Sequence, residues 1–149
     1  TVITQNVDSL HEKAGSSKVL HLHGQLMQSR SSLDESLVYD MDHWEMKLGD
    51  LCEKGSQLRP NIVWFGEAVP MMDLAIEFTK AADILLVVGT SLVVYPAAGL
   101  INYTAENIPT FIVDPNKPDI REESDFHFIT EKATIGLPLL KEILLTEYT

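Results

Sequence analysis

Cysteine and long apolar runs are nearly absent from this sequence. Cys52 is the only cysteine among 149 residues, which excludes an intrachain disulfide and any zinc site built from several cysteines. Sparse cysteine usage is typical of a reducing compartment. No apolar run is long enough to cross a bilayer, and residues 1–4 lack the basic start and cleavage pattern of a signal peptide. We therefore expect a cytoplasmic protein without a membrane partner.

Basic residues are scarce as well. The chain has 11 Lys and Arg against 22 Asp and Glu, a formal charge of −11, which disfavours binding to nucleic acid and favours basic protein partners. An apolar content of 45% fits a globular domain with a core. The first residue is Thr1, and the chain opens directly with a strand-like run. We therefore expect a fragment of a longer protein.

Short apolar runs typical of strands alternate along the chain with segments whose apolar residues have helical spacing, and this order predicts an α/β protein. Short apolar runs that end at polar residues or glycine indicate strands, and apolar residues three or four apart indicate helices. This order predicts a Rossmann-like parallel sheet with helices on both faces. We expect strands at residues 2–3, 19–23, 62–65, 83–89 and 110–113, with 83–89 in the centre, and helices at 10–14 and 70–82, from Pro96, and from Gly136 with Leu137, Leu140, Ile143 and Leu144 buried.

Residues 25–58 lack this regularity, because serine-rich and acidic stretches interrupt them. We interpret them as a small irregular module inserted between the two parts of the sheet domain, residues 1–24 and 59–149. Within the module, residues 41–51 are predicted to form a helix that carries Trp44 and Leu48 on one side.

Polar residues follow most of the predicted strands. Ligands of open parallel sheets bind at the carboxyl ends of the strands, and a Gly-Thr-Ser turn offers N–H groups and hydroxyls to a phosphate. Each feature alone has an ordinary structural explanation: a simple turn, a strand end, or a core histidine. His21 and His23 could also begin a metal site, although no further ligands complete it. The strand ends carry Gln5, Asn6, Asp8, His23, Gly89, Thr90, Ser91, Asp114 and Asn116.

Five longer motifs occur in order along nearly the whole chain. They are Thr4-Gln-Asn-Val-Asp8-Ser-Leu-His11, His21-Leu-His-Gly24, Arg59-Pro-Asn-Ile-Val-Trp-Phe-Gly-Glu67, Val88-Gly-Thr-Ser-Leu-Val-Val-Tyr-Pro96-Ala-Ala, and Ala133-x-x-x-Leu137-Pro138. Together they resemble the sirtuins, which are NAD-dependent protein-lysine deacylases. Because the resemblance covers nearly the whole chain, chance is a poor explanation for it.

The resemblance implies a role for each strand end. His23 is implied as the catalytic base that deprotonates a ribose hydroxyl, after the acyl-lysine oxygen has displaced nicotinamide. Gln5, Asn6 and Asp8 are implied to line the nicotinamide-ribose pocket, with Asn6 and Asp8 also serving catalysis. The rest of NAD is implied to contact Gly89, Thr90 and Ser91, either Asp114 or Asn116, and the backbone of Lys132 and Ala133.

The same resemblance implies that acyl-lysine peptides or proteins are the partners. An extended peptide would pair with a strand of the enzyme, and the implied substrate-binding residues are Val63, Phe65, Gly66, Glu67 and Val94. The products would be nicotinamide, free lysine and O-acyl-ADP-ribose. Acyl-chain preference, physiological substrates and oligomeric state stay undetermined.

Two departures from the sirtuin pattern bear on cofactors. The family's first strand and Gly-Ala-Gly phosphate loop should lie upstream of Thr1, so the fragment alone is expected to bind NAD poorly and to be inactive. Most sirtuins hold zinc with four cysteines, whereas residues 25–58 contain only Cys52, and Ser31 stands where a ligand is expected. We therefore expect no zinc, and Trp44 and Leu48 should stabilise the module instead.

Two other functions remain open. The chain could be an ADP-ribosyltransferase in which His23 activates another acceptor, or a catalytically silent module that binds NAD or ADP-ribose. A module that only binds has no need of a base at the ribose, so His23 together with Asn6 and Asp8 favours an enzyme.

Overall fold

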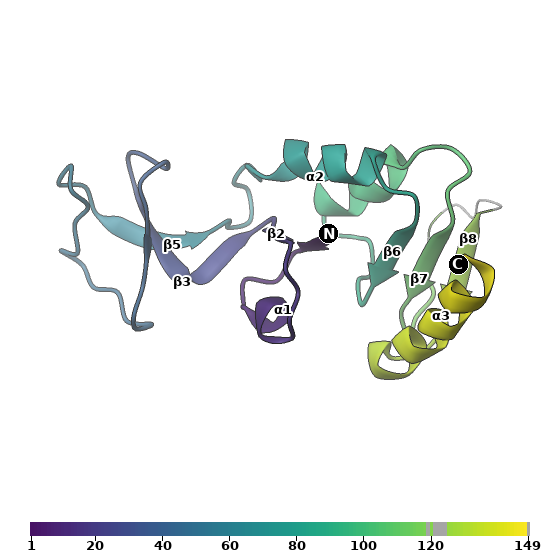
Figure 1. Cartoon of the computed structure of the whole chain (residues 1–149). Helices are drawn as coiled ribbons and strands as arrows, with labels where there is room; N and C mark the ends of the chain where they lie inside the picture. Colours follow the sequence, from purple (N-terminus) through teal and green to yellow (C-terminus); the bar gives the residue numbers. More distant parts are fainter. Residues whose placement is uncertain (119, 121–124, 149) are drawn as a thin grey trace. The chain divides into compact units, whose positions relative to one another are not determined.

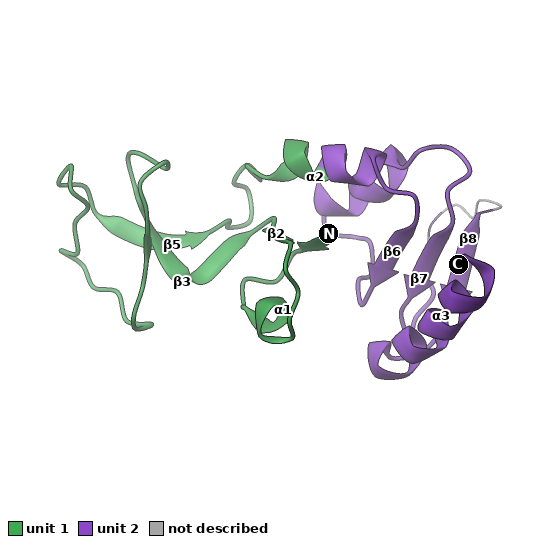
Figure 2. Cartoon of the chain, viewed as in Figure 1, with its two compact units in different colours: residues 1–75 green, residues 76–149 purple. Residues whose placement is uncertain are grey.

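The computed structural model describes residues 1–118, 120 and 125–148. The chain forms two compact units, Thr1–Ala75 and Ile76–Thr149, which Figures 1 and 2 show by sequence position and by unit. The boundary falls inside α2 (Met72–Lys80). In the part of the chain that the structure describes, no helix is both long and apolar enough to span a membrane.

The first unit begins with two short parallel strands. β1 (Val2–Thr4) pairs with β2 (Val19–His21), and a loop with α1 (Leu10–Lys13) connects them. The carboxylate of Asp8 accepts a hydrogen bond from the amide of Leu10 at 3.0 Å, which satisfies a donor of the first helical turn. The elements predicted here are confirmed, except that β2 ends at His21, so His23 lies in the following turn and not in the strand.

Most of the remainder of the first unit is an antiparallel sheet with its connecting loops. β3 (Gly24–Ser31) lies between β4 (Val38–Asp40) and β5 (Leu58–Ile62), and Figure 1 labels β3 and β5 as neighbouring strands. The pairing of β3 with β5 begins at Gly24 opposite Ile62 and shifts register before Ser29. Residues 25–58 are therefore more regular than the sequence pattern suggested.

The helix predicted at residues 41–51 does not form. The segment consists of bends, a turn at residues 48–49 and irregular chain, and Trp44 and Leu48 are 83% and 96% exposed, so neither residue stabilises the module as predicted. A helix with an apolar side forms when a surface covers that side, and the described residues provide none. Polar bonds close the turns instead: Asp50 accepts from the amide of Lys47 at 2.7 Å, as a turn-forming side chain does.

The strand predicted at residues 62–65 is also misplaced. β5 ends at Ile62, and Trp64 and Phe65 lie in a turn in which Phe65 is 99% exposed. The amide of Glu67 donates to the carbonyl of Trp64 at 3.0 Å, and the Glu67 carboxylate accepts from the Trp64 amide at 3.0 Å. These local bonds satisfy the backbone without a neighbouring strand.

The second unit contains a parallel sheet of β6 (Leu85–Val88), β7 (Thr110–Val113) and β8 (Phe126–Ile129) in that order. β7 is the central strand and all its residues are buried, whereas β6 lies at an edge of this sheet and Leu86 is 44% exposed. The prediction that residues 83–89 form the centre is therefore wrong for this sheet, since a continuous apolar run fits a partly covered strand as well as a central one. β8 was not predicted.

Two helices follow strands of this sheet. The segment after Pro96 forms η1 (Ala97–Tyr103), a 3-10 helix that buries Ala97 and Ala98. α3 (Ala133–Glu147) begins earlier than the predicted Gly136 and packs on β7 (Figure 1). Its buried side chain is Leu140, which joins Phe111 and Val113 in the core with Ile143 and Leu144 at its margin, whereas Leu137, predicted to be buried, is 39% exposed.

Candidate functional site

The loop at residues 5–8, between β1 and α1, is held from two directions. The amide of Asn6 donates to Thr4 Oγ1 at 3.1 Å, and the carbonyl of Val7 accepts from the amide of Leu26 in β3 at 2.8 Å. Thr4 is itself buried, and its carbonyl accepts from the amide of Leu22 at 2.9 Å. The loop backbone is thus fixed, while the side chain of Asn6 is exposed and those of Gln5 and Asp8 are half-buried.

His23 is bound to this loop through one ring nitrogen. Its Nδ1 lies 3.1 Å from the carbonyl oxygen of Gln5, and because a carbonyl only accepts, Nδ1 carries the hydrogen. In the neutral ring, Nε2 then has the free lone pair and can accept a proton. The carbonyl of His23 accepts from the amide of Val63 at 2.9 Å. The structure thus brings Gln5, His23 and Val63 together within the first unit.

His21 is buried and bonded at both ring nitrogens. Nδ1 contacts the carbonyl oxygen of Asn6 at 3.1 Å, and Nε2 contacts Glu12 Oε1 at 2.8 Å. The hydrogen bond from His21 is the main cause that lowers the pKa of Glu12 below its ordinary value. Both nitrogens are engaged with oxygen atoms, and the described residues contain no group of three or more His, Cys, Asp or Glu that could hold a metal ion. His21 and His23 are therefore parts of the loop anchorage.

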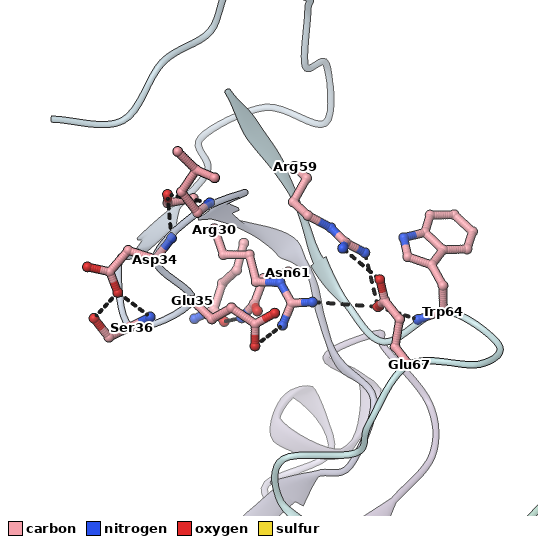
Figure 3. A network of polar contacts seen from close by, with 11 residues as sticks. Arg30, Asp34, Glu35, Ser36, Arg59, Asn61, Trp64 and Glu67 are labelled. Carbon is pink, nitrogen blue, oxygen red and sulfur yellow. Dashed lines mark hydrogen bonds and ion pairs between the residues drawn. The ribbon is translucent and has the colours of Figure 1, made fainter. Parts of the chain in front are cut away.

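Glu67 is the centre of a polar network that holds the turn after β5 (Figure 3). Arg59 of β5 donates two hydrogen bonds to its carboxylate, at 2.7 and 3.1 Å, and Arg30 of β3 lies 3.5 Å from it and 3.5 Å from Glu35. The hydrogen bonds from Arg59 are the largest cause that lowers the pKa of Glu67. The network orients the turn that contains Phe65 and Gly66, two of the predicted substrate residues.

Arg30 is a member of this network that the sequence analysis missed. It is 6% exposed, although arginine is rarely buried without a charged partner. The sequence did offer one indication: Arg30 lies in the run after Gly24, and an arginine buried within a strand needs a carboxylate close to it. The identity of that carboxylate is decided by strand pairing, which places Arg30 opposite Arg59.

In the second unit, the predicted phosphate and ribose residues share one sheet edge. β6 and β7 pair with Val88 opposite Val113, and the amide of Gly89 donates to the carbonyl of Val113 at 3.0 Å. Gly89 and Asp114 therefore leave neighbouring parallel strands at their carboxyl ends. The carboxylate of Asp114 accepts from the backbone amide of Asn116 at 2.8 Å, and Asn116 is exposed.

The other predicted residues of the second unit lie on turns and helix ends. Thr90 Oγ1 accepts from the amide of Leu92 at 3.3 Å, and Ser91 is exposed. Lys132 is the N-cap of α3 and Ala133 is its first residue. Val94 is 39% exposed, and its carbonyl accepts from the amide of Ala98 at 2.8 Å.

A buried chain of hydroxyl and thiol groups joins the end of β3 to the loop before β5, within the module at residues 25–58. Ser31 Oγ accepts from the amides of Leu33 and Asp34 and lies 2.6 Å from Ser56 Oγ. Ser56 Oγ lies 3.1 Å from Cys52 Sγ, and this hydrogen bond is the main cause that lowers the pKa of Cys52 to about 7. Because Ser31 Oγ already accepts from two amides, its own hydroxyl hydrogen is free to point to Ser56 Oγ.

Comparison with known proteins identifies the family. The family model described as "Sir2 family" matches residues 1–96, more than half of the chain. The chain belongs to the Sir2 family. The resemblance to sirtuins drawn from the five motifs is thereby confirmed, and so is the Rossmann-like α/β fold, which the Sir2 structures share.

Individual Sir2 relatives match at substantial identity. An NAD-dependent protein deacylase of Bacteroides thetaiotaomicron is 43% identical over 150 residues, 97% of this chain and 64% of that protein. One of Helicobacter pylori is 48% identical over 134 residues, 89% of this chain and 57% of that protein. The crystal structure of a Sir2 homolog in complex with NAD superposes with a TM-score of 0.79 at 35% identity, covering 97% of this chain and 58% of the other. The chain thus spans about 60% of these relatives.

The residues of the module do not fit a structural zinc ion. Zinc in such sites is held by four thiolate or imidazole ligands, whereas Ser31 and Ser56 offer hydroxyls that are already bonded to each other. Cys52 supplies the one thiol of the sequence. A hydrogen-bonded cluster of Ser31, Cys52 and Ser56 thus holds together loops of the module.

Proposed function

We propose that this protein removes acetyl or other acyl groups from protein lysines in an NAD-dependent reaction that yields nicotinamide and O-acyl-ADP-ribose. One observation carries the proposal. His23 is fixed through Nδ1 to Gln5, in the loop at residues 5–8, so that its Nε2 is the proton acceptor. The relatives named NAD-dependent protein deacylases supply the reaction class and point to protein substrates.

NAD fits the chemistry of the proposed cofactor residues. When bound, it supplies an electrophilic ribose carbon with nicotinamide as the leaving group. In the first unit, Asn6 and Asp8 offer an amide and a carboxylate next to the His23 anchorage. In the second unit, the carboxyl edge of the sheet offers hydroxyls and a carboxylate suited to phosphate and ribose. The proposed contacts are Gln5, Asn6, Asp8, Gly89, Thr90, Ser91, Asp114, Asn116, Lys132 and Ala133.

The catalytic role of this chain is proton transfer and positioning. Nε2 of His23 accepts a proton from a ribose hydroxyl, a task for which an imidazole suits neutral pH. Gln5 keeps the ring in the tautomer that leaves Nε2 unprotonated. Asn6 and Asp8 orient the ribose and the carboxamide.

Acyl-lysine peptides are the proposed partners. Val63, Phe65, Gly66, Glu67 and Val94 form the proposed contacts. The backbone at Val63 is bonded to His23, so a peptide beside it lies near the base. Phe65 is exposed on a turn that Glu67 and Arg59 hold in place. This supports a docking surface that is already ordered before the peptide binds.

We further propose that the protein acts in the cytoplasm, and that residues 25–58 form a module on a domain made of residues 1–24 and 59–149. We also propose that the protein has no structural zinc, which the cluster of Ser31, Cys52 and Ser56 supports. We expect elemental analysis of the purified protein to give less than about one tenth of an equivalent of zinc. Stoichiometric zinc that survives dialysis against a chelator contradicts it.

The test of the proposed function uses the complete natural protein with NAD and an acetyl-lysine peptide, followed by mass spectrometry of peptide and nucleotide. With wild type we expect the peptide to lose its acetyl group only when NAD is present, and with His23→Ala we expect turnover to fall by about 10²-fold or more while NAD still binds. The exposed His43 gives a matched control, since His43→Ala should act as wild type. ADP-ribosylated protein without O-acyl-ADP-ribose indicates a transferase, and NAD binding without any turnover indicates a silent binding module.

A further inference from the structure

The two histidines of the motif His21-Leu-His-Gly24 bind two consecutive carbonyl groups of one loop. His23 Nδ1 bonds the carbonyl of Gln5 and His21 Nδ1 bonds that of Asn6, both at 3.1 Å. The base is therefore neighboured by a second imidazole that holds the same loop. Only one of the two has a role in the proposed function.

The second nitrogen of His21 distinguishes it from His23. Nε2 of His21 lies 2.8 Å from Glu12 Oε1, on α1. Both partners of His21, a carbonyl oxygen and a carboxylate oxygen, are acceptors, so the ring satisfies both when each nitrogen carries a hydrogen, and the bond to Glu12 is then charge-assisted. His21 is 9% exposed. A buried cation that depends on one carboxylate is strongly affected when that partner is removed.

We propose that His21, paired with Glu12, is the positioning residue that holds the loop at residues 5–8 in its NAD-binding form. The inference rests on the proposed function and deepens it by adding a residue that acts through the loop. His21 fixes the carbonyl of Asn6, and with it the backbone that carries the Asn6 side chain and the carbonyl of Gln5. The latter sets the tautomer of His23.

Kinetic constants separate this role from a purely structural one. Loss of the bond from His21 to Asn6 leaves the loop free to rearrange, so KM for NAD rises and kcat falls, while KM for the acyl-lysine peptide stays unchanged. A lower folded fraction would reduce kcat and leave both KM values in place. The expected loss in kcat/KM for NAD is about 10-fold to 100-fold, the range for a hydrogen bond made by a charged donor.

Three variants of His21 in the complete natural protein test which bond matters. In His21→Asn the side-chain amide nitrogen stands where Nδ1 was and keeps the bond to Asn6. In His21→Gln it stands where Nε2 was and keeps only the bond to Glu12, and His21→Leu removes both. We expect His21→Asn to stay within about fivefold of wild type, and His21→Gln and His21→Leu to show the full loss. His43→Asn, at an exposed histidine, is the matched control.

The carboxylate is tested with Glu12→Gln, with the exposed Glu106→Gln as its control. We expect KM for NAD to rise in Glu12→Gln and to stay at the wild-type value in Glu106→Gln. The proposal is overturned if His21→Gln retains as much activity as His21→Asn, if His21→Asn is as impaired as His21→Leu, or if KM for NAD does not change in any variant.

Calorimetric NAD titration keeps this inference distinct from the proposed function. If wild type shows no deacylation, the proposed function fails. Kd for NAD in the same variants still decides the role of His21: weaker binding in His21→Gln with near-normal binding in His21→Asn supports positioning of the loop, and equal affinities overturn it.

Discussion

At the scale of single residues, Gly24 is a position where only one amino acid fits. Its φ is +78°, a left-handed conformation, and a Cβ there would meet the backbone carbonyl oxygen of Asn61 in β5. Left-handed backbone costs other residues about 1–2 kcal/mol, and the steric conflict adds about 1–3 kcal/mol. We expect Gly24→Ala to lower the free energy of unfolding by the sum, measured by urea denaturation.

Gly55 provides a control for this experiment. Its φ is +76°, nearly that of Gly24, but a Cβ there has no neighbouring atom within 4 Å. Gly55→Ala should therefore show the conformational cost of about 1–2 kcal/mol alone. Equal denaturation midpoints for the two variants would show that the close approach of β3 and β5 is not what requires glycine at Gly24.

At the scale of elements, the turn after β5 depends on the charge of Glu67. Its pKa is lowered by hydrogen bonds from Arg59 and from the amide of Trp64, so the stabilisation is present above the ordinary glutamate pKa near 4.5. It is lost as pH falls through the lower pKa of the folded state. In Glu67→Gln we expect the amide of Trp64 to exchange roughly tenfold faster at neutral pH, measured by hydrogen exchange and NMR.

Measuring the exchange rate of the Trp64 amide over a range of pH tests whether the charge of Glu67 holds the turn. As pH falls, wild type and Glu67→Gln should converge, because wild type loses the same charge by protonation. The amide of Ser32 serves as a reference, since it donates to the carbonyl of Gln57 and not to a carboxylate. A constant difference between the two proteins down to the most acidic pH would show that the charge does not hold the turn.

At the scale of the whole chain, the net charge of −11 over these 149 residues favours lysine-rich peptides among the proposed substrates. Salt screens this attraction, with a Debye length of about 10 Å at ~0.1 M. We expect KM for a lysine-rich acyl peptide to rise roughly threefold as ionic strength increases from ~0.05 to ~0.5 M. A neutral peptide with the same acyl group should change little, and an equal rise for both peptides would contradict the electrostatic account.

Much of the fold was accessible from local patterns. Strands β1 and β7, helix α1 and the turn at Gly89 follow from short apolar runs and glycine positions, which are properties of neighbouring residues. The prediction of a helix with Trp44 and Leu48 was wrong because apolar spacing indicates a helix only if another surface covers the apolar side of that helix. The prediction of a strand at residues 62–65 was wrong because an ion pair between Arg59 and Glu67, eight residues apart, closes a turn there.

Sequence alone determined the family and the identities of His23, Asn6 and Asp8 as proposed site residues, because these depend on which side chains occur in which order. Tertiary structure decided what those side chains bind. The pairing of β1 with β2 places Thr4 opposite His21, so that both histidines reach carbonyl groups fifteen or more residues earlier. Such contacts depend on strand register and on long-range closure of the chain, which no local pattern specifies.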